Sequence, residues 1–279
     1  MSAGLQRALT DRGPRAYLRG RRRVAETTVL RRRTRVLLGV AGIVIVLGAW
    51  EAAYRLGVVS KVTGSSPSQI GVAARVLVQH HLLFPAIWSS TKLFLIGFSL
   101  CVGIGLVVGL VLGWYRRLHA VFDPWVTMLY AAPRLALIPL VVVWVGIGVE
   151  AQVVIVFLVG VFPMIINTMA GVMAMDRTHF RVARSFLATN KDVLLTVALP
   201  GALPFIISGI RQTLVLSLTG VVVAEYFLGE TGVGGLIFKS GQVLETGQAF
   251  VGVAIFCFAA VVLTIALGVV EKRFDKWRG

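Results

Sequence analysis

The sequence has few charged residues and only two cysteines. Asp, Glu, Lys and Arg together make up 14% of its 279 residues. Cys101 and Cys257 both lie in apolar runs, so they predict neither a disulfide framework nor a metal site. The four histidines lack the spacing of metal ligands, and we interpret them as solvated or interfacial: His80, His81, His119 and His179.

Sequence motifs of hydrolytic and nucleotide-binding enzymes are also missing. None of the six lysines follows a glycine, so the GxxxxGK[ST] loop that cradles phosphates is absent. HExxH does not occur, and no serine, histidine and acid form a recognisable catalytic motif. The glycines at 232–235 form no dinucleotide-binding fingerprint, and we interpret them as a flexible loop. The sequence thus predicts neither an enzyme nor a cofactor held by this chain.

Apolar residues, in contrast, are abundant. They make up 57% of the chain, and the mean hydropathy is +0.86. Because a helix needs about 20 apolar residues to cross a bilayer, we expect an all-α integral membrane protein with about six spans. The expected spans are 36–56, 93–114, 121–148, 153–173, 205–227 and 250–270.

The remaining segments complete the predicted organisation. A basic tail at 1–35 precedes the first transmembrane helix at 36–56, and an external loop with an amphipathic helical segment follows at 57–88. The membrane core covers 89–272, with a polar loop at 174–201, and a short tail occupies 273–279. The glycine-rich stretch 228–248 is only moderately hydrophobic, and a re-entrant loop is one interpretation of it.

Basic residues gather in alternate loops between the predicted spans. The chain has 28 basic and 12 acidic residues, and eleven arginines precede the first span. A nucleic-acid-binding domain would instead spread its basic residues over a folded surface. Since Lys and Arg accumulate in cytoplasmic loops, we expect both termini and the loop 174–201 to be cytoplasmic. The arginine-rich tail suits a cytoplasmic anchor or a polybasic segment that binds lipid.

Small residues recur at every fourth position of the second expected span. Residues spaced by four share one helix face, and small ones let another backbone approach closely. We therefore expect this face to pack against protein, although glycine is also simply common in membrane helices. The stripe consists of Gly97, Cys101, Gly105, Gly109 and Gly113.

Three prolines interrupt the third apolar run, at Pro124, Pro133 and Pro139. Each removes a backbone donor, which a bilayer tolerates mainly where protein or a water-filled cavity covers the freed carbonyls. We therefore predict that this run lines a translocation pathway. Arg134 would face a cavity, a counter-charge or an anionic substrate there, unless it lies near the cytoplasmic interface and snorkels.

Other polar residues lie inside the later spans. Asn167 lies in the fourth span, and Arg211 and Glu225 lie in the fifth. The last two are 14 residues apart, or about 21 Å along a helix, so they cannot pair directly. We expect Glu225 near the outer end of its span, as a gate or a loop contact. The predicted pathway residues are Pro133, Arg134, Pro139, Asn167 and Glu225.

The polar stretch at 180–200, FRVARSFLATNKDVLLTVALP, has the pattern of a helix, a turn and a second helix. Asp176 or Thr178 can cap the first helix, while Thr189 and Asn190 suit the turn and the second cap. We expect Pro200 to stop the second helical run. From its pattern alone, this hairpin could pack on the membrane core, lie in the lipid interface or dock on a partner.

This hairpin resembles the signature loop of the permease subunits of type I ABC importers, written E-A-A, three residues, G, nine residues, then I, any residue, L and P. Aligned on Pro200, the chain matches it at Ala183, Val197 and Leu199. The segments 131–148, 199–211 and 224–237 resemble the nitrate, sulfonate and taurine branch of that family. The resemblance covers about 89–272 and implies a MetI-like permease fold.

Two positions depart from the signature. Arg181 stands where the family has Glu, and Leu187 stands where it has the turn-forming Gly. Since leucine cannot adopt a left-handed turn cheaply, we expect the bend to shift to Asn190. These departures bear on coupling, on the docking partner, and on whether the chain forms a heterodimer. The candidate coupling residues are Arg181, Ala183, Ser185, Leu187, Val197, Leu199 and Pro200.

The resemblance implies a division of labour. The hairpin would dock on a cytoplasmic ATPase that holds ATP and Mg, while an external binding protein delivers the solute to two permease copies. The branch implies a small anion, such as a sulfonate, taurine or nitrate. The alternative is an ion- or proton-coupled secondary transporter, which would need acidic residues near the bilayer midplane and two matching halves. The sequence has neither.

Overall fold

The computed structural model describes residues 32–58, 60, 64–175, 177–229 and 231–275, and within these ranges every regular element is helical. The chain divides into two compact units, Met1–Leu56 and Gly57–Gly279. The expectation of an all-α chain with about six apolar spans is confirmed. Most of the predicted basic tail and the last four residues lie outside the described ranges.

The described part of the first unit is one helix, α3 (Arg32–Arg55). Its segment Leu37–Arg55 has a mean hydropathy of 1.8, and nearly all of that segment is exposed. A helix that is apolar on all its faces is suited to lipid. Glu51 near its end accepts a hydrogen bond from Arg55 at 2.8 Å, one turn later, so these two charges neutralise each other at the helix end.

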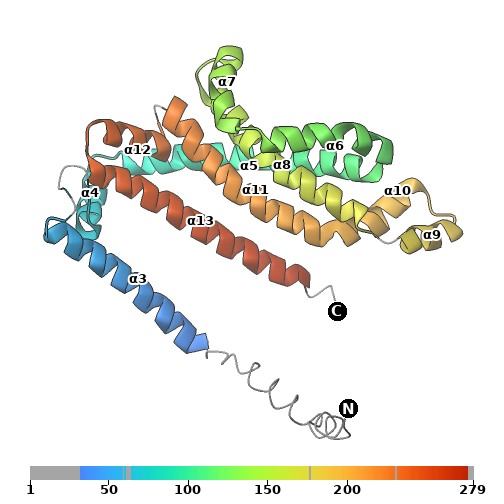
Figure 1. Ribbon diagram of the computed structural model, residues 1–279, viewed down its shortest axis with the longest axis horizontal. Helices are drawn as coiled ribbons and strands as arrows, with labels where there is room; N and C mark the ends of the chain where they lie inside the picture. The colour runs from blue at the N-terminus through green and yellow to red at the C-terminus, as the bar shows by residue number, and fades with distance from the viewer. Residues whose placement is uncertain (1–31, 59, 61–63, 176, 230, 276–279) are drawn as a thin grey trace, which may run out of the picture. The chain divides into compact units, whose positions relative to one another are not determined.

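Among its described residues, the second unit has four helices of 25 residues or more and several shorter ones (Figure 1). In chain order they are α4 (Pro67–Gln79), α5 (Leu83–Trp114), α6 (Arg116–Ala131), the 3-10 helix η1 (Arg134–Leu137), α7 (Ile138–Val145), α8 (Val149–Met173), α9 (Arg177–Ser185), α10 (Asn190–Val193), the π-helix η2 (Leu194–Ala198), α11 (Leu199–Leu228), α12 (Val233–Gln242) and α13 (Thr246–Asp275).

Four helices of the second unit are long and apolar enough to cross a membrane alone, and a bent pair can supply one more span. The four are α5, α8, α11 with its α10 and η2 extension, and α13. The predicted third span is instead bent by 91° between Arg116–Ala131 and Arg134–Val145. The bend follows Ala132, whose extended backbone (φ −61°, ψ 145°) is typical of a residue before proline.

Helix α8 lies at the centre of the second unit. In its most apolar stretch 61% of the residues are buried, against 28% in α5 and 11% in α13. Both α5 and α11 pack against it along their length. The core of the unit therefore forms around α8, while the outer helices keep apolar surface for lipid.

The small-residue stripe of α5 faces α8. A Cβ atom added to Gly105 would lie 2.7 Å from the Cβ of Met164, and one on Gly113 would lie 2.8 Å from the Cβ of Val172. At these positions only glycine lets the two helices approach so closely. Residue numbers rise together along the contact, so α5 and α8 run parallel. The stripe glycines that meet α8 are Gly97, Gly105, Gly109 and Gly113.

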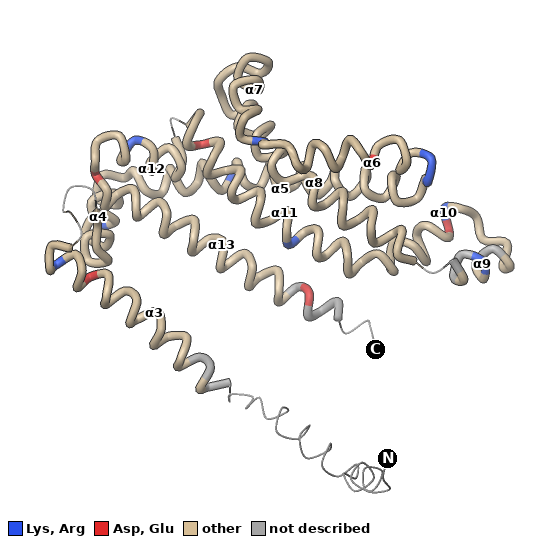
Figure 2. The backbone as a smooth tube through the Cα atoms, viewed as in Figure 1, with Lys and Arg blue, Asp and Glu red and all other residues tan. Residues whose placement is uncertain are grey.

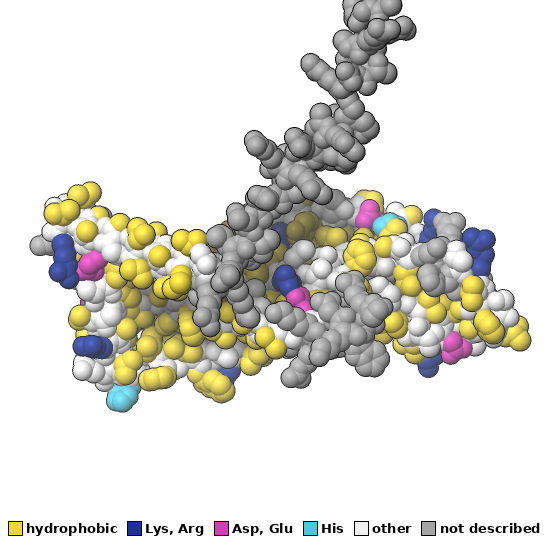
Figure 3. Space-filling view, turned by 90° about the horizontal axis from the view of Figure 1, so that it is seen from below, with side chains coloured by type: hydrophobic (Ala, Val, Ile, Leu, Met, Phe, Trp, Pro, Cys, Tyr) yellow, Lys and Arg dark blue, Asp and Glu magenta, His cyan; other side chains and the backbone are white. Residues whose placement is uncertain are grey.

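Helix α11 packs against α8 in the opposite direction. A Cβ on Gly160 would lie 2.5 Å from Ser217 Oγ, and one on Gly171 would lie 2.7 Å from the Cβ of Phe205. Figure 2 shows long uncharged stretches in α5, α8, α11 and α13. Hydrophobic side chains cover much of the visible face in Figure 3. This surface pattern is typical of a membrane domain.

The structure differs from the predicted boundaries at several places. Helix α5 begins at Leu83, ten residues before the expected start of its span. The glycine-rich stretch after α11 contains a regular helix, α12, with a buried first turn. The predicted helix in the external loop is α4, which Ser66 caps by accepting from the Gln69 amide at 3.3 Å.

Candidate functional site

The predicted hairpin lies at one end of the second unit, which we call the α9 end, while α4 and α12 lie at the other, the α4 end (Figure 1). Helix α9 closes with the Ala188 amide donating to the Ala183 carbonyl at 3.2 Å, and Leu187 adopts φ 61°. This is a Schellman ending, with leucine where glycine is usual. The expectation that the bend shifts to Asn190 is wrong, because the chain turns at Leu187 itself.

The second helix of the hairpin starts with a capping box. Thr189 Oγ1 accepts from the Asp192 amide at 3.3 Å, and Asp192 Oδ2 accepts from the Thr189 amide at 2.9 Å. Thr189 therefore caps the second helix, as predicted. Of the two predicted caps of the first helix, Thr178 lies inside α9 and Asp176 lies outside the described residues. The helix does not stop at Pro200. The π-helix η2 precedes it, with the Leu199 amide donating to Leu194, and the helical chain continues to Leu228.

The tip of the hairpin is apolar and exposed. Phe186 is 82% exposed and Leu187 is 92% exposed. Among the candidate coupling residues, Arg181 and Ser185 are exposed on α9, and the Ser185 hydroxyl donates to the Val182 carbonyl at 2.7 Å. Ala183, Val197 and Leu199 are half-buried, and Pro200 is exposed.

The predicted pathway run, 121–148, forms most of α6 together with η1 and α7, with a break after Ala132. Pro133 and Pro139 are both exposed, and Pro139 lies in the first turn of α7, where a missing amide disrupts no helical hydrogen bond. Helix α7 is short and has one buried face, with Ile138 and Val141, and one exposed face, with Val143 at 78% and Trp144 at 75%. The irregular backbone at the break before η1 needs protein or water beside it, because lipid cannot satisfy its polar groups.

Arg134 occupies the inside of this break and is half-buried. Its guanidinium donates to the Val159 carbonyl of α8 at 2.8 Å and to the Tyr130 carbonyl of α6 at 3.1 Å. It also lies 5.0 Å from the centre of the Tyr130 ring. In this state the side chain therefore joins α6 to α8, and two of its five donors are engaged by backbone.

Asn167 is half-buried one turn after the proline of α8. Its amide donates to the Pro163 carbonyl at 2.8 Å and to Gln212 Oε1 on α11 at 3.4 Å. It lies eight residues, or about 12 Å along α8, from the carbonyl that Arg134 contacts. Asn167 and Arg134 thus mark two different levels of the helix.

Glu225 lies in the last turn of α11, at the α4 end, and is only 1% exposed. Its Oε2 accepts from the Ser90 hydroxyl of α5 at 2.7 Å and from the Gly234 amide of α12 at 2.9 Å. The Ser90 hydroxyl in turn accepts from the Val233 amide at 2.9 Å. Three helices therefore meet at one carboxylate, and two amides of the first turn of α12 find acceptors there.

The glycines after α11 close tightly around this carboxylate. Gly232 has φ 103°, and a Cβ there would overlap the Glu225 carboxyl group. A Cβ on Gly234 would lie 2.7 Å from the Cβ of Glu225. The interpretation of 232–235 as a flexible loop is wrong, because these residues are buried and the glycines serve close approach.

The predicted pathway residues do not converge on one cavity. Arg134 and Asn167 contact different parts of α8, and Glu225 is enclosed at the α4 end. Arg211, which the sequence separates from Glu225, instead forms an ion pair with Glu271 of α13. Sequence reasoning missed Ser90, since a lone serine in an apolar run carries no signal of a partner 135 residues away.

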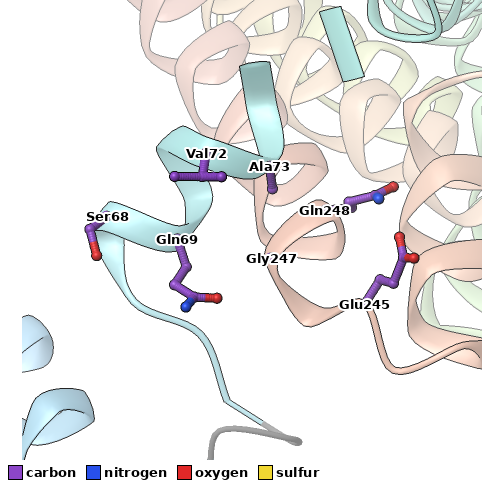
Figure 4. A pocket seen from close by; sticks show the side chains of 7 residues that line it. All are labelled: Ser68, Gln69, Val72, Ala73, Glu245, Gly247 and Gln248. Atoms are coloured by element: carbon purple, nitrogen blue, oxygen red, sulfur yellow. The ribbon is translucent and has the colours of Figure 1, made fainter. Parts of the chain in front are cut away.

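A pocket of about 340 Å³ opens at the α4 end, between α4 and the start of α13 (Figure 4). Its lining combines apolar surface with the polar side chains of both helices. Nearby, the Thr246 hydroxyl donates to the Gly64 carbonyl at 2.8 Å and fixes the start of α13 to the segment before α4. The lining residues are Ser68, Gln69, Val72, Ala73, Glu245, Gly247 and Gln248.

The sequence is similar to those of known transport proteins. The family model described as binding-protein-dependent transport system inner membrane component matches residues 102–278. The chain is 32% identical to SsuC of Bacillus subtilis (strain 168), a permease protein assigned to aliphatic sulfonates transport, over 84% of this chain and 85% of the relative. It is 28% identical to the taurine transport system permease protein TauC of Escherichia coli (strain K12), over 88% and 90%.

Two further similarities widen this picture. The chain is 32% identical to the bicarbonate transport system permease protein CmpB of Synechococcus elongatus, over 65% of this chain and 63% of the relative. Its fold is similar to a chain in the solved inward-facing conformations of the MetNI methionine ABC transporter. That match has a TM-score of 0.62 and 19% identity, and covers 70% of this chain and 97% of the other. At this identity the likeness supports the fold alone.

Proposed function

Because this chain belongs to the family of binding-protein-dependent transport system inner membrane components, we propose that it lines the route by which a small anionic solute crosses the membrane. It is a multi-pass membrane protein and a permease subunit of an ABC importer, and such subunits are not enzymes. ATP and Mg would bind in a separate ATPase subunit.

The break between α6 and α7 is the observation that carries this proposal. Exposed, irregular backbone in an apolar run must face water or protein. A solute route supplies the water, and a second permease copy supplies the protein. In this arrangement Pro133 and Pro139 line the route, and Arg134 fixes the break to α8 through its bond to the Val159 carbonyl. Asn167 lies further along the same helix.

The α9 end would face the cytoplasm. The basic residues Arg116, Arg117, Arg181 and Lys191 lie in loops or helix ends at or near that end. Six crossings, with the bent pair counted as one, bring both termini to the same side. The α4 end, with its pocket between α4 and α13, would then face outward, where a binding protein delivers the solute.

The exposed apolar tip of the hairpin suits an ATPase groove. Phe186 and Leu187 are exposed apolar side chains that would be stabilised by burial in such a groove. The hairpin that carries them is fixed by a Schellman ending and a capping box. Since α10, η2 and α11 form one helical stretch, movement of the ATPase would pass directly into the membrane core.

The solute is proposed to be a small anion, such as a sulfonate, taurine or nitrate. SsuC, TauC and CmpB are named for aliphatic sulfonates, taurine and bicarbonate, and these solutes carry an acidic group. The unused donors of Arg134 suit such a group, because a guanidinium binds oxyanions in its plane.

Uptake into vesicles that contain the chain, its ATPase and its binding protein tests the proposal. We expect uptake of a labelled sulfonate to require ATP and to stop with vanadate or with an ATPase variant that cannot hydrolyse ATP. An ion- or proton-coupled secondary transporter would keep its uptake under both treatments and lose it with an ionophore. That second pattern would overturn the proposal.

The same preparation tests the assembly. If the chain as the only permease supports full uptake, the complex contains two identical copies. If uptake requires a second, related permease, the departures at Arg181 and Leu187 belong to one half of a heterodimer.

A further inference from the structure

The carboxylate of Glu225 ties three helices together in a buried site. Ser90 links it to α5, the Gly234 amide links it to α12, and its own backbone belongs to α11. The Ser90 hydroxyl also accepts from the Val233 amide, so Ser90 connects α5 to α12 both directly and through the Glu225 carboxylate. We infer that Glu225 and Ser90 form a latch that holds the start of α12 on α5 and must open during transport.

The composition of the site argues for a contact that can break. Glu225 Oε1 is buried and has no hydrogen-bond partner among the described residues. A buried carboxylate oxygen without a partner is costly, so apolar packing would give a firmer joint. The Glu225 carboxylate thus joins α5, α11 and α12 only while its bonds to Ser90 and Gly234 are formed.

The cage around the Glu225 carboxylate consists of Ser90, Gly232, Val233 and Gly234, and its glycines leave no room for a larger side chain. Gly232 and Gly234 leave no room for a Cβ atom beside Glu225, and Gly229 donates its amide to the Glu225 carbonyl at 2.9 Å. Gln152 of α8 adds a bond to the Leu228 carbonyl at 3.3 Å, which fixes the end of α11. The first turn of α12 is therefore held against α11 and α5 through Glu225 and Ser90.

The latch also has a mechanical link to the α9 end. The helical stretch Asn190–Leu228 covers 39 residues, or about 58 Å. Its first turn lies in the hairpin and its last turn holds Glu225. A rotation or shift of the hairpin would therefore be carried along one continuous helix to the residue whose carboxylate bonds Ser90 of α5 and Gly234 of α12.

This inference rests on the proposed function for its meaning, since the latch would close the outer end of the solute route. In that role Glu225 is a positioning residue, because it acts through α12 and touches no solute in this state. Loss of the latch should release α12 and let ATP hydrolysis proceed without solute movement.

Spin labels on the full chain in lipid nanodiscs can measure the position of α12. Phe84 of α5 is 66% exposed, and Gly241 of α12 has open space around it, so both accept a labelled cysteine. Cys257 is exposed and would be replaced by alanine, while the buried Cys101 is retained. We expect one narrow distance distribution with Glu225 and Ser90 present.

Two variants should broaden that distribution or add a second distance. Glu225→Ala removes the whole junction, and Ser90→Ala removes only its link to α5. Breaking hydrogen bonds to a buried charge should shift the docked population about tenfold or more. Glu225→Gln keeps one acceptor oxygen and should restore part of the docked population. If Glu225→Ala does not fold, Ser90→Ala decides.

The neighbouring serine offers a matched control. Ser89 lies beside Ser90 on α5 and makes an exposed hydrogen bond to Thr231 at 3.3 Å. Ser89→Ala breaks a contact between α5 and the segment just before α12 but leaves the buried junction intact, so the distance should not change. A narrow, unchanged distribution in both Glu225→Ala and Ser90→Ala would overturn the latch.

Transport measurements separate this inference from the proposed function. With the ATPase present, Ser90→Ala should hydrolyse about tenfold more ATP for each solute molecule taken up than the parent chain. Equal coupling in Ser90→Ala and parent would contradict the role in transport. If the parent takes up no solute while the label distances respond as expected, the latch stands and the proposed function fails.

Discussion

Arg134 donates to the Val159 carbonyl, and that carbonyl lacks its helical partner because position 163 is proline. In a regular α-helix the amide of residue 163 would bond to Val159, but proline has none. The guanidinium from the broken third span thus replaces a hydrogen bond that the fourth span cannot make. Its second bond goes to the Tyr130 carbonyl, which lies in the last turn of α6 and has no amide of the next turn to accept from.

This pairing predicts that Arg134 and Pro163 are energetically coupled. Arg134→Ala should lower the free energy of unfolding by about 2 kcal/mol, since hydrogen bonds from a charged group are lost. In a Pro163→Ala background, the introduced alanine supplies the missing amide, and the same change should cost about 1 kcal/mol less. A double-mutant cycle of unfolding in mixed micelles measures the difference, and strictly additive effects would contradict the pairing.

Arg134 should also affect uptake through its geometry. Arg134→Lys keeps the charge but cannot reach two carbonyls with one planar group. We expect Arg134→Ala to lower anion uptake at least about tenfold at equal amounts of assembled protein, and Arg134→Lys to retain an intermediate rate. Uptake by vesicles, normalised to the amount of complex, tests this. Unchanged uptake in Arg134→Ala would remove the residue from the solute route.

The glycine stripe of α5 gives a stability prediction with an internal control. A Cβ on Gly109 would lie 2.7 Å from the Ile165 carbonyl oxygen, which is backbone and cannot move aside. Gly109→Ala should therefore destabilise the unit by about 1–3 kcal/mol, as measured by unfolding in mixed micelles. Gly103 lies on the same helix with nothing within 4 Å of its would-be Cβ, so Gly103→Ala should be within about 0.5 kcal/mol of the parent.

Leu187 should be a strained position whose relief stabilises the hairpin. A non-glycine residue in the left-handed region costs about 1–2 kcal/mol. Leu187→Gly should therefore slow hydrogen exchange of the Ala188 amide, which closes the helix on Ala183. Leu187→Ala keeps the strain and should show no such protection. Faster exchange in Leu187→Gly than in the parent would refute this prediction.

The hairpin tip should contribute to ATPase binding. Phe186→Ser removes an 82% exposed aromatic ring and should weaken binding of the ATPase about fivefold or more. Val243→Ser offers the control, because Val243 is 66% exposed but lies at the α4 end. Binding of the purified ATPase to nanodiscs measures both. Equal loss in the two variants would indicate a general effect of the added polar group.

Hydropathy predicted the long helices, because a membrane span must be apolar over its whole length. It missed the first ten residues of α5, where a polar start such as Ser89, Ser90 and Lys92 hides a helix that continues into the span. It also gave no sign that the third span bends by 91°. Proline marks where a helix can break, but the bend angle depends on which groups donate hydrogen bonds to the carbonyls that proline leaves unpaired.

The contacts of the candidate site were less accessible from sequence. The type of residue at 225 suggested a gate or a loop contact, yet the cage needs Ser90, 135 residues earlier, and only the fold brings them together. Leu187 shows the opposite failure. Local preference argued against a left-handed leucine, but the fold fixes the turn there despite the strain.

The register between α5 and α8 restricts how this domain can move. Each stripe glycine meets the residue 59 positions later in α8, from Gly97 with Val156 to Gly113 with Val172. A slide between the two helices would have to cover a whole step of four residues, about 6 Å, because every smaller shift drives a side chain into backbone. The pair should therefore travel as a single rigid lever, with a hinge at the bend after α6.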